Sequence, residues 1–442
     1  MSTPAMLTGE TLRAATRAAL EARPPDAPIS TRRALAFVYA GYALRYAYLL
    51  VLIPYYGRVL GAAEYGRLLA AMSLYQIVWM LGEYGFPVVG ARDAAACRDR
   101  AQLGDLFGRH VSGRLWMALP GLAVGLAGTL ASPLLHENPM LGALATANGL
   151  LAAFNLGWFF QGTLRFRTSV LLEAAGFAIN LPLILLLVRG PGDGTMALAI
   201  LFGSNIVCTL AGYALALRGI ERRAVRCRGG RRLVRDATAL FAHKGFTMMT
   251  ATSSTYLLSL FSSAAQVGWY GAAERLAAVG LSLMQPANHV LVGTVARQIS
   301  AKESEADAWR LMRGALVAMT AFGVVLLVGT LALAGIAVPV ILGPDFAPSV
   351  PLLCTLGLLF PFAALSQVIT GYVLIPLRHD ALVSRVSVAA ALVTVLLVVA
   401  LALLHDGAGV AWARVASQVG LSLTLVAVLH RKQLIARIWR CA

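Results

Sequence analysis

The chain has 442 residues, of which 59% are hydrophobic and 13% charged, and it carries a formal net charge of +17. Soluble domains are about one-quarter charged, so this composition excludes an ordinary soluble domain and indicates a polytopic membrane protein. A net charge of +17 is also compatible with nucleic-acid binding, and the positions of the basic residues decide between the two interpretations.

Apolar stretches long enough to cross a bilayer recur from residue 34 almost to the end of the chain. A spanning helix needs about 20 predominantly apolar residues. The first stretch has full spanning length and lacks a small-residue cleavage site, so we expect no cleavable signal peptide. We predict twelve spans, at roughly 34–56, 66–90, 115–132, 141–162, 169–188, 195–217, 240–262, 270–296, 314–338, 351–376, 382–404 and 408–429.

The basic residues fall on one side of this topology. With the N-terminus in the cytoplasm, 30 of the 37 arginines and lysines lie in the two tails or in cytoplasmic connections. Cytoplasmic loops of membrane proteins carry such an excess. We therefore attribute the charge to topology and not to nucleic-acid binding, and we predict a multi-pass membrane protein with both termini in the cytoplasm.

The longest and most basic connection divides the spans into two sets of six, a layout that is typical of transporters built from parallel repeats. A faint internal similarity agrees, because Tyr65-Gly66 opens the second span and Tyr270-Gly271 opens the eighth, 205 residues later. The predicted units are a cytoplasmic tail at 1–33, a six-helix bundle at 34–217, a basic cytoplasmic linker at 218–239, a second six-helix bundle at 240–430 and a cytoplasmic tail at 431–442.

Arg45 lies alone in the first predicted span. Its nearest basic neighbours are Arg33 and Arg58, so it lies roughly 18–20 Å from either of these charges at about 1.5 Å per residue. A cation at that depth costs about 2.5–3.5 kcal/mol on insertion scales and usually marks a functional site. Arg45 is too deep to reach the interface, and the alternative to anion binding is a buried ion pair, with Glu83 as its candidate partner.

Two further cations, Arg275 and Arg414, lie near the outer ends of spans 8 and 12. Long side chains near a helix end often extend to the interface, and this is the alternative interpretation of Arg414. Arg275 has the alternative of a structural ion pair with another helix. Its neighbour Glu274 points about 100° away on the same helix and pairs poorly with it.

Three acids inside the spans, Glu83, Glu173 and Glu274, are candidates for binding a coupling ion, because a buried carboxylate near cations can gain or lose a proton. Glycines flank Glu83 and indicate an irregular stretch there. Glu173 lies near a span end and has snorkelling as its alternative. The uncharged polar residues are interpreted as interhelical hydrogen-bonding groups; they are Asn148, Asn155, Asn180, Asn205, Gln285, Asn288 and His289.

Motifs for enzyme chemistry are missing from the sequence. There is no phosphate-binding loop, HExxH or GxSxG, and the predicted outer loops are too short to hold an extramembrane active site. The five cysteines have no metal-ligand spacing and are expected to be reduced. We therefore expect no enzyme activity, no cofactor and no metal site.

Four stretches resemble the polysaccharide (O-antigen) flippases, the Wzx-type branch of the multidrug/oligosaccharidyl-lipid/polysaccharide exporter superfamily. The most specific is WFFQG at 158–162, which matches the end of the family's fourth span. The others are 60–99, which includes a Tyr-Gly entry to span 2, 267–291 at the start of the second half, and 342–380, which begins with LGPDF. Their order and spacing extend the resemblance over about residues 34–430.

The resemblance implies an all-α, V-shaped exporter fold and a flippase that moves a polyprenyl-diphosphate-linked oligosaccharide from the cytoplasmic to the periplasmic face of the inner membrane. It also implies membrane lipids, a polymerase and chain-length components as partners. Arg45, Arg275 and Arg414 would be the cavity cations that bind substrate. The chemistry agrees, because arginine presents bidentate donors to phosphate and stays charged at any relevant pH.

Two other functions remain open on the sequence. A drug or cation antiporter of the same superfamily would favour acids in its cavity, whereas the deepest charge here is Arg45. A membrane-embedded glycan polymerase or transferase would need a sizeable loop carrying acids or histidines, and the predicted outer loops are short.

Overall fold

The computed structural model describes residues 31–238, 241, 253–284, 305–377 and 379–434. These residues are almost entirely helical, and no strand occurs among them. Seven of the described helices are long and apolar enough to cross a membrane. The chain is therefore an all-α polytopic membrane protein, as its hydropathy predicted.

The first bundle contains helix α2 and four of the seven candidate spans, at Arg100–Ala131, Pro139–Gly162, Phe166–Leu187 and Gly194–Leu217. Helix α2 is a helical hairpin, because Gly61 with φ 71° and ψ 172° breaks it into two arms. This connection is shorter than the loop at 57–65 expected from hydropathy. The elements are α2 (Thr31–Glu83), α3 (Phe86–Ala96), α4 (Arg100–Ala131), α5 (Pro133–His136), α6 (Pro139–Ala153), α7 (Gly157–Gly162), α8 (Phe166–Leu187) and α9 (Gly194–Leu217).

Local sequence explains where several of these helices begin. Asp99 caps α4 by accepting a hydrogen bond from the Gln102 backbone N–H. Asn138 caps α6 in the same way and precedes a proline at the first helical position, where no N–H is needed. Helix α4 thus starts well before residue 115, where hydropathy placed the span, and its first turns are amphipathic.

The second bundle follows a linker that contains a short 3₁₀ helix, η1 (Arg222–Ala224). Most of the span predicted at 240–262 lies outside the described residues. Helix α17 is a second helical hairpin, broken at His405 and Asp406. The elements are α11 (Ser254–Leu258), α12 (Ala264–Ser282), α14 (Glu305–Leu342), η2 (Pro344–Phe346), α15 (Ser349–Gly357), α16 (Leu359–Val368), the π-helical segment η3 (Ile369–Leu374) and α17 (Asp380–Arg431).

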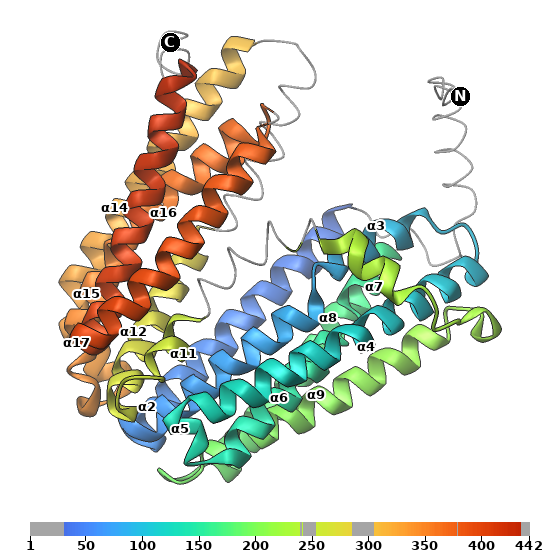
Figure 1. Cartoon of the computed structure of the whole chain (residues 1–442), viewed down its shortest axis with the longest axis horizontal. Helices are drawn as coiled ribbons and strands as arrows, with labels where there is room; N and C mark the ends of the chain where they lie inside the picture. The colour runs from blue at the N-terminus through green and yellow to red at the C-terminus, as the bar shows by residue number, and fades with distance from the viewer. Residues whose placement is uncertain (1–30, 239–240, 242–252, 285–304, 378, 435–442) are drawn as a thin grey trace.

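The two bundles form a V (Figure 1). They meet at one end, which we call the apex, and diverge toward the side where α2 begins and α17 ends. Contacts between the bundles at the apex include the Ser132 and Ser259 hydroxyls, 2.9 Å apart, and a hydrogen bond of 2.8 Å from the Tyr256 hydroxyl to the Gly128 carbonyl. Arg58 also donates to the Val340 carbonyl across the apex.

A reciprocal glycine contact joins α2 to α12 at the apex. A Cβ atom on Gly66 would lie 1.9 Å from the Ala264 carbonyl oxygen, and one on Gly268 would lie 1.9 Å from the Ala62 carbonyl oxygen. Small residues four apart on both helices let the backbones approach this closely. The contact of Gly66 with Ala264 is mirrored by that of Gly268 with Ala62. Exchanging residue 62 with 264 and residue 66 with 268, both at an offset of 202, therefore reproduces the contact, with AAEYG and AAQVG in equivalent places.

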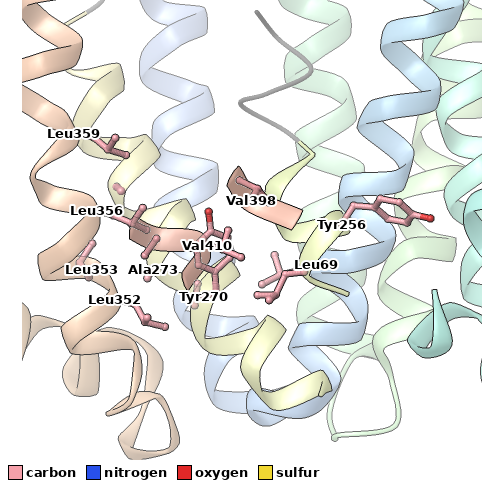
Figure 2. Packing of buried hydrophobic residues seen from close by; sticks show 14 of the residues in the cluster. Leu69, Tyr256, Tyr270, Ala273, Leu352, Leu353, Leu356, Leu359, Val398 and Val410 are labelled. Carbon is pink, nitrogen blue, oxygen red and sulfur yellow. The ribbon is translucent and has the colours of Figure 1, made fainter. Parts of the chain in front are cut away.

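Apolar side chains fill the second bundle around α12. Figure 2 shows Tyr270 and Ala273 of α12 between Leu353 and Leu356 of α15 on one side and Leu69 of α2 on the other. All five are buried in one continuous cluster. Helix α12 therefore belongs to the second bundle and also carries its contact with the first.

Candidate functional site

Arg45 forms an ion pair with Glu173 of α8. Its Nη2 and Nε atoms lie 2.5 and 2.8 Å from the same Oε1 atom of Glu173. The two side chains are 52% and 32% exposed. The partner is not Glu83, which sequence reasoning had offered, and the pair is open to its surroundings instead of buried.

Arg414 lies inside the second bundle, where it pairs with Glu274. Its Nη1 atom lies 2.6 Å from Glu274 Oε1 and 3.0 Å from Ser254 Oγ. Thr255 donates to Glu274 Oε2 at 2.5 Å, and the Tyr270 hydroxyl donates to Oε1 at 3.3 Å. With side-chain exposures of 15% and 18%, the pair is largely enclosed. It ties α11, α12 and α17 together, and Arg414 does not extend to the interface.

Arg275 points away from this network toward the first bundle. Although it follows Glu274 in sequence, its Nη2 atom lies 4.0 Å from the Met72 sulfur of α2. It is half-buried, and it makes no ion pair with any described residue. Among the three predicted cations, Arg275 alone lacks a carboxylate partner in the described part of the chain.

Glu83 ends α2 at a backbone break. Tyr84 follows with φ 43° and Gly85 with φ 75°, so the irregular stretch expected from the flanking glycines is present. Glu83 forms no hydrogen bond or ion pair with a described residue. The buried Arg114 guanidinium acts on it electrostatically.

Arg114 is a cation that sequence reasoning assigned to a cytoplasmic connection. It is only 2% exposed and lies inside the first bundle. Its Nε atom donates to the Ala153 carbonyl at 2.6 Å, and its guanidinium lies 5.6 and 5.4 Å from the ring centroids of Phe86 and Trp158. The Nη2 atom has no hydrogen-bond partner among the residues that the structure describes. In the sequence, the signal for a buried Arg114 is its spacing of four residues from His110, which puts both on one helix face. The Arg114 Nη1 and His110 Nδ1 atoms lie 3.4 Å apart.

The WFFQG segment forms α7 and packs inside the first bundle. Trp158, Phe159 and Phe160 are all buried, and Trp158 stacks on His110 with ring centroids 4.2 Å apart. In this structure the motif holds α7 against α3 and α4.

Three of the predicted interhelical asparagines, Asn148, Asn180 and Asn205, bond to neighbouring helices, whereas Asn155 does not. Asn205 donates to Asn148 at 2.7 Å, and Asn180 bonds with Ser204 and accepts from Tyr48. Asn155 bonds locally to the Gly157 N–H. His289, Gln285 and Asn288 lie outside the described residues.

Comparisons with known proteins agree with the sequence resemblance. The model of a family described as "Polysaccharide biosynthesis protein" matches residues 34–298, more than half of the chain. A relative from Shigella dysenteriae is 20% identical over 372 residues, 83% of this chain and 91% of its own length. One from Escherichia coli (strain K12) is 22% identical over 420 residues, 92% of this chain and 99% of its own. Both are named "Putative O-antigen transporter".

Two solved structures share the fold. "Lipid II flippase MurJ, inward closed conformation" superposes with a TM-score of 0.71 at 12% identity, covering 90% of this chain and 87% of its own. An inward-facing multidrug resistance MATE family transporter of the MOP superfamily gives a TM-score of 0.53 at 14% identity, covering 89% and 98%. At these identities the likeness concerns the fold. The chain therefore belongs to the polysaccharide biosynthesis protein family.

Proposed function

We propose that this protein is a flippase that moves a polyprenyl-diphosphate-linked oligosaccharide from the cytoplasmic to the periplasmic face of the inner membrane. Membership of the family and the names of the two curated relatives support a polysaccharide cargo. The observation that carries the proposal is Arg275, a guanidinium that faces α2 and has no carboxylate partner among the described residues.

The charge of the cargo explains why such a cation is needed. A diphosphate is a concentrated anion, and moving it unaided through hydrocarbon is prohibitive. Arginine donates bidentate hydrogen bonds to phosphate oxygens and stays charged. We assign headgroup binding to Arg275 and, after exchange of its Glu173 partner, to Arg45. Arg414 is already bonded to Glu274, so we assign it a bracing role.

We propose alternating access between units at 34–217 and 240–430. The Gly66–Gly268 contact would be the outer gate, closed in this structure, and the divergent side would face the cytoplasm. Single cysteines at Asp345 near the apex and at Arg228 in the linker test this orientation in a cysteine-free background. An impermeant thiol reagent added to intact cells should label position 345 only, and labelling of 228 would reverse the topology.

The acids have separate proposed roles. Glu83 is the candidate for a coupling proton, because it forms no hydrogen bond or ion pair with a described residue and lies at the backbone break that ends α2. Glu173 and Glu274 act as counter-ions of Arg45 and Arg414. With both of these acids paired to arginines, a site for an organic cation is less favoured than a site for an anion.

Gene deletion separates the proposed function from its rivals. Deletion should abolish a surface or secreted polysaccharide while diphosphate-linked repeat units accumulate facing the cytoplasm. Loss of the lipid-linked precursor would instead show that the protein acts in the synthesis of that precursor. Unchanged polysaccharide with increased drug sensitivity would favour the antiporter.

A further inference from the structure

The linker between the bundles carries an unusual density of exposed cations. Within residues 222–235 seven arginines are exposed: Arg222, Arg223, Arg226, Arg228, Arg231, Arg232 and Arg235. None of the seven forms an ion pair with a described residue. Glu221 and Asp236 are the acids in the segment. Seven arginines against two acids leave residues 221–236 with a net charge of +5.

The backbone beneath these arginines is seated on α4. The Glu221 N–H donates to the Arg100 carbonyl at 3.1 Å. A Cβ atom on Gly104 would lie 2.7 Å from the Glu221 carbonyl oxygen, and one on Gly108 would lie 2.5 Å from that of Arg226. Only glycine leaves room for so close an approach. We call residues 219–235 the basic strap.

The end of the strap is anchored by apolar side chains. Leu233, Val234 and Ala237 pack against Phe86 and Met117 of the first bundle. In Figure 1 this part of the linker lies beside α3 and α7. The apolar side is thus used for packing, and the arginines are left on the outer side.

The strap lies at the boundary of the membrane. It begins two residues after Leu217, where the spanning helix α9 ends. Clusters of 4–8 arginines or lysines directly beside a span attract anionic lipid headgroups. If these arginines served only to set the membrane topology, a flexible loop would be enough to carry them. Here the backbone is packed closely against Gly104 and Gly108, and this packing points to a fixed surface.

We propose that the basic strap is a docking surface for anionic phospholipid headgroups of the leaflet that borders it. Seven arginines spread along an exposed segment fit several lipid phosphates better than one diphosphate. The surface is seated on the first bundle, through α4 and the cluster around Phe86. Bound lipids would therefore hold the first bundle to the leaflet, whatever the cargo is.

The test uses the full-length protein in nanodiscs of zwitterionic lipid, titrated with phosphatidylglycerol. Hydrogen–deuterium exchange of residues 219–235 should slow as the anionic lipid is added. The triple variant Arg222→Gln, Arg226→Gln and Arg231→Gln should bind the lipid with an affinity lower by about fivefold per arginine, on the order of a hundredfold in all. Equal protection of the wild type and the triple variant would overturn the proposal.

A second variant separates a fixed surface from net charge. Gly108→Ala keeps every arginine and should unseat the strap, so it should lose part of the lipid-dependent protection. Gly203→Ala is the matched control, because a Cβ there meets nothing within 4 Å. If Gly108→Ala behaves like Gly203→Ala, net charge alone attracts lipid and the docking surface is refuted. Protection by inorganic pyrophosphate but not by phosphatidylglycerol would also refute it, in favour of the cargo headgroup.

Discussion

The two arginine–glutamate pairs of the described chain that link different spans have opposite surroundings. Arg414 and Glu274 are enclosed, and three hydroxyl groups complete their hydrogen bonding. Arg45 and Glu173 have similar contact distances but are 52% and 32% exposed. A pair that is sealed by its neighbours holds helices together, whereas an exposed pair can exchange partners at little cost. The same two residue types therefore serve different purposes in the two bundles.

The free energy of unfolding should depend strongly on the enclosed pair and weakly on the exposed pair. Removing one partner of a buried pair costs about 3–5 kcal/mol, because the other charge is left without compensation. An exposed pair contributes about 0–1 kcal/mol. The substitutions below are ordered by their expected effect on the free energy of unfolding, and each would break or sharpen the contrast between the pairs.

Arg414→Ala should have the largest effect. It strands Glu274 among Ser254, Thr255 and Tyr270, and we expect about 3–5 kcal/mol of destabilisation and a clear loss of membrane abundance. The double variant Arg414→Ala with Glu274→Ala should recover much of that abundance. If the single variant accumulates normally, the enclosed pair is not a brace.

Gly66→Ala should come next, because a Cβ atom cannot fit against the Ala264 carbonyl. Overpacking of this kind costs about 1–3 kcal/mol, and here the cost falls on the closed apex. A cysteine at Ser259 in a cysteine-free background should therefore react faster with a thiol reagent. The control is Gly329→Ala, where a Cβ meets nothing within 4 Å. Unchanged labelling in the Gly66 variant would mean that the crossing is not a gate.

Arg45→Ala should change stability little, by about 0–1 kcal/mol, because Glu173 is left partly exposed. Thermal unfolding in detergent at low and high salt checks this, since salt screens exposed pairs more than enclosed ones. Abundance falling as far as for Arg414→Ala would show that the Arg45 pair is also structural.

Arg275→Glu should affect stability least and transport most. No described carboxylate loses a partner, so abundance should stay normal, while polysaccharide export should stop through repulsion of the anionic headgroup. Arg275→Lys should retain partial export, because it keeps the charge and loses the fork geometry. Normal export by Arg275→Glu would remove this residue from the binding site.

Much of the fold could be predicted from sequence, because span length and the one-sided placement of arginines are local properties. The partners of the charges could not. Arg45 and Glu173 are 128 residues apart, and nothing local distinguishes Glu173 from Glu83 as the partner. Arg114 was assigned to a connection because the apolar stretch starts at residue 115, whereas its burial comes from Phe86 and Trp158 on other helices.

The internal repeat has a second candidate register. Sequence similarity pairs Tyr65-Gly66 with Tyr270-Gly271, at an offset of 205 residues. The reciprocal backbone contact relates Gly66 to Gly268, at an offset of 202. A matched dipeptide carries too little information to fix a register, so the offset of 205 stays a prediction.

The equal offsets in the glycine contact have a consequence for how such an interface can change. In a two-fold symmetric dimer each contact occurs twice, so one substitution alters both sides together. Here both halves belong to one chain, and each side can vary alone. In AAEYG and AAQVG the two alanines are the same on both sides. The next two positions differ: Glu64 and Tyr65 in the first segment correspond to Gln266 and Val267 in the second. The fifth is glycine in both, where the backbones touch. Because the two halves belong to one chain, the two sides of this contact can differ at any position except the glycine, where the packed backbones leave no room for a side chain.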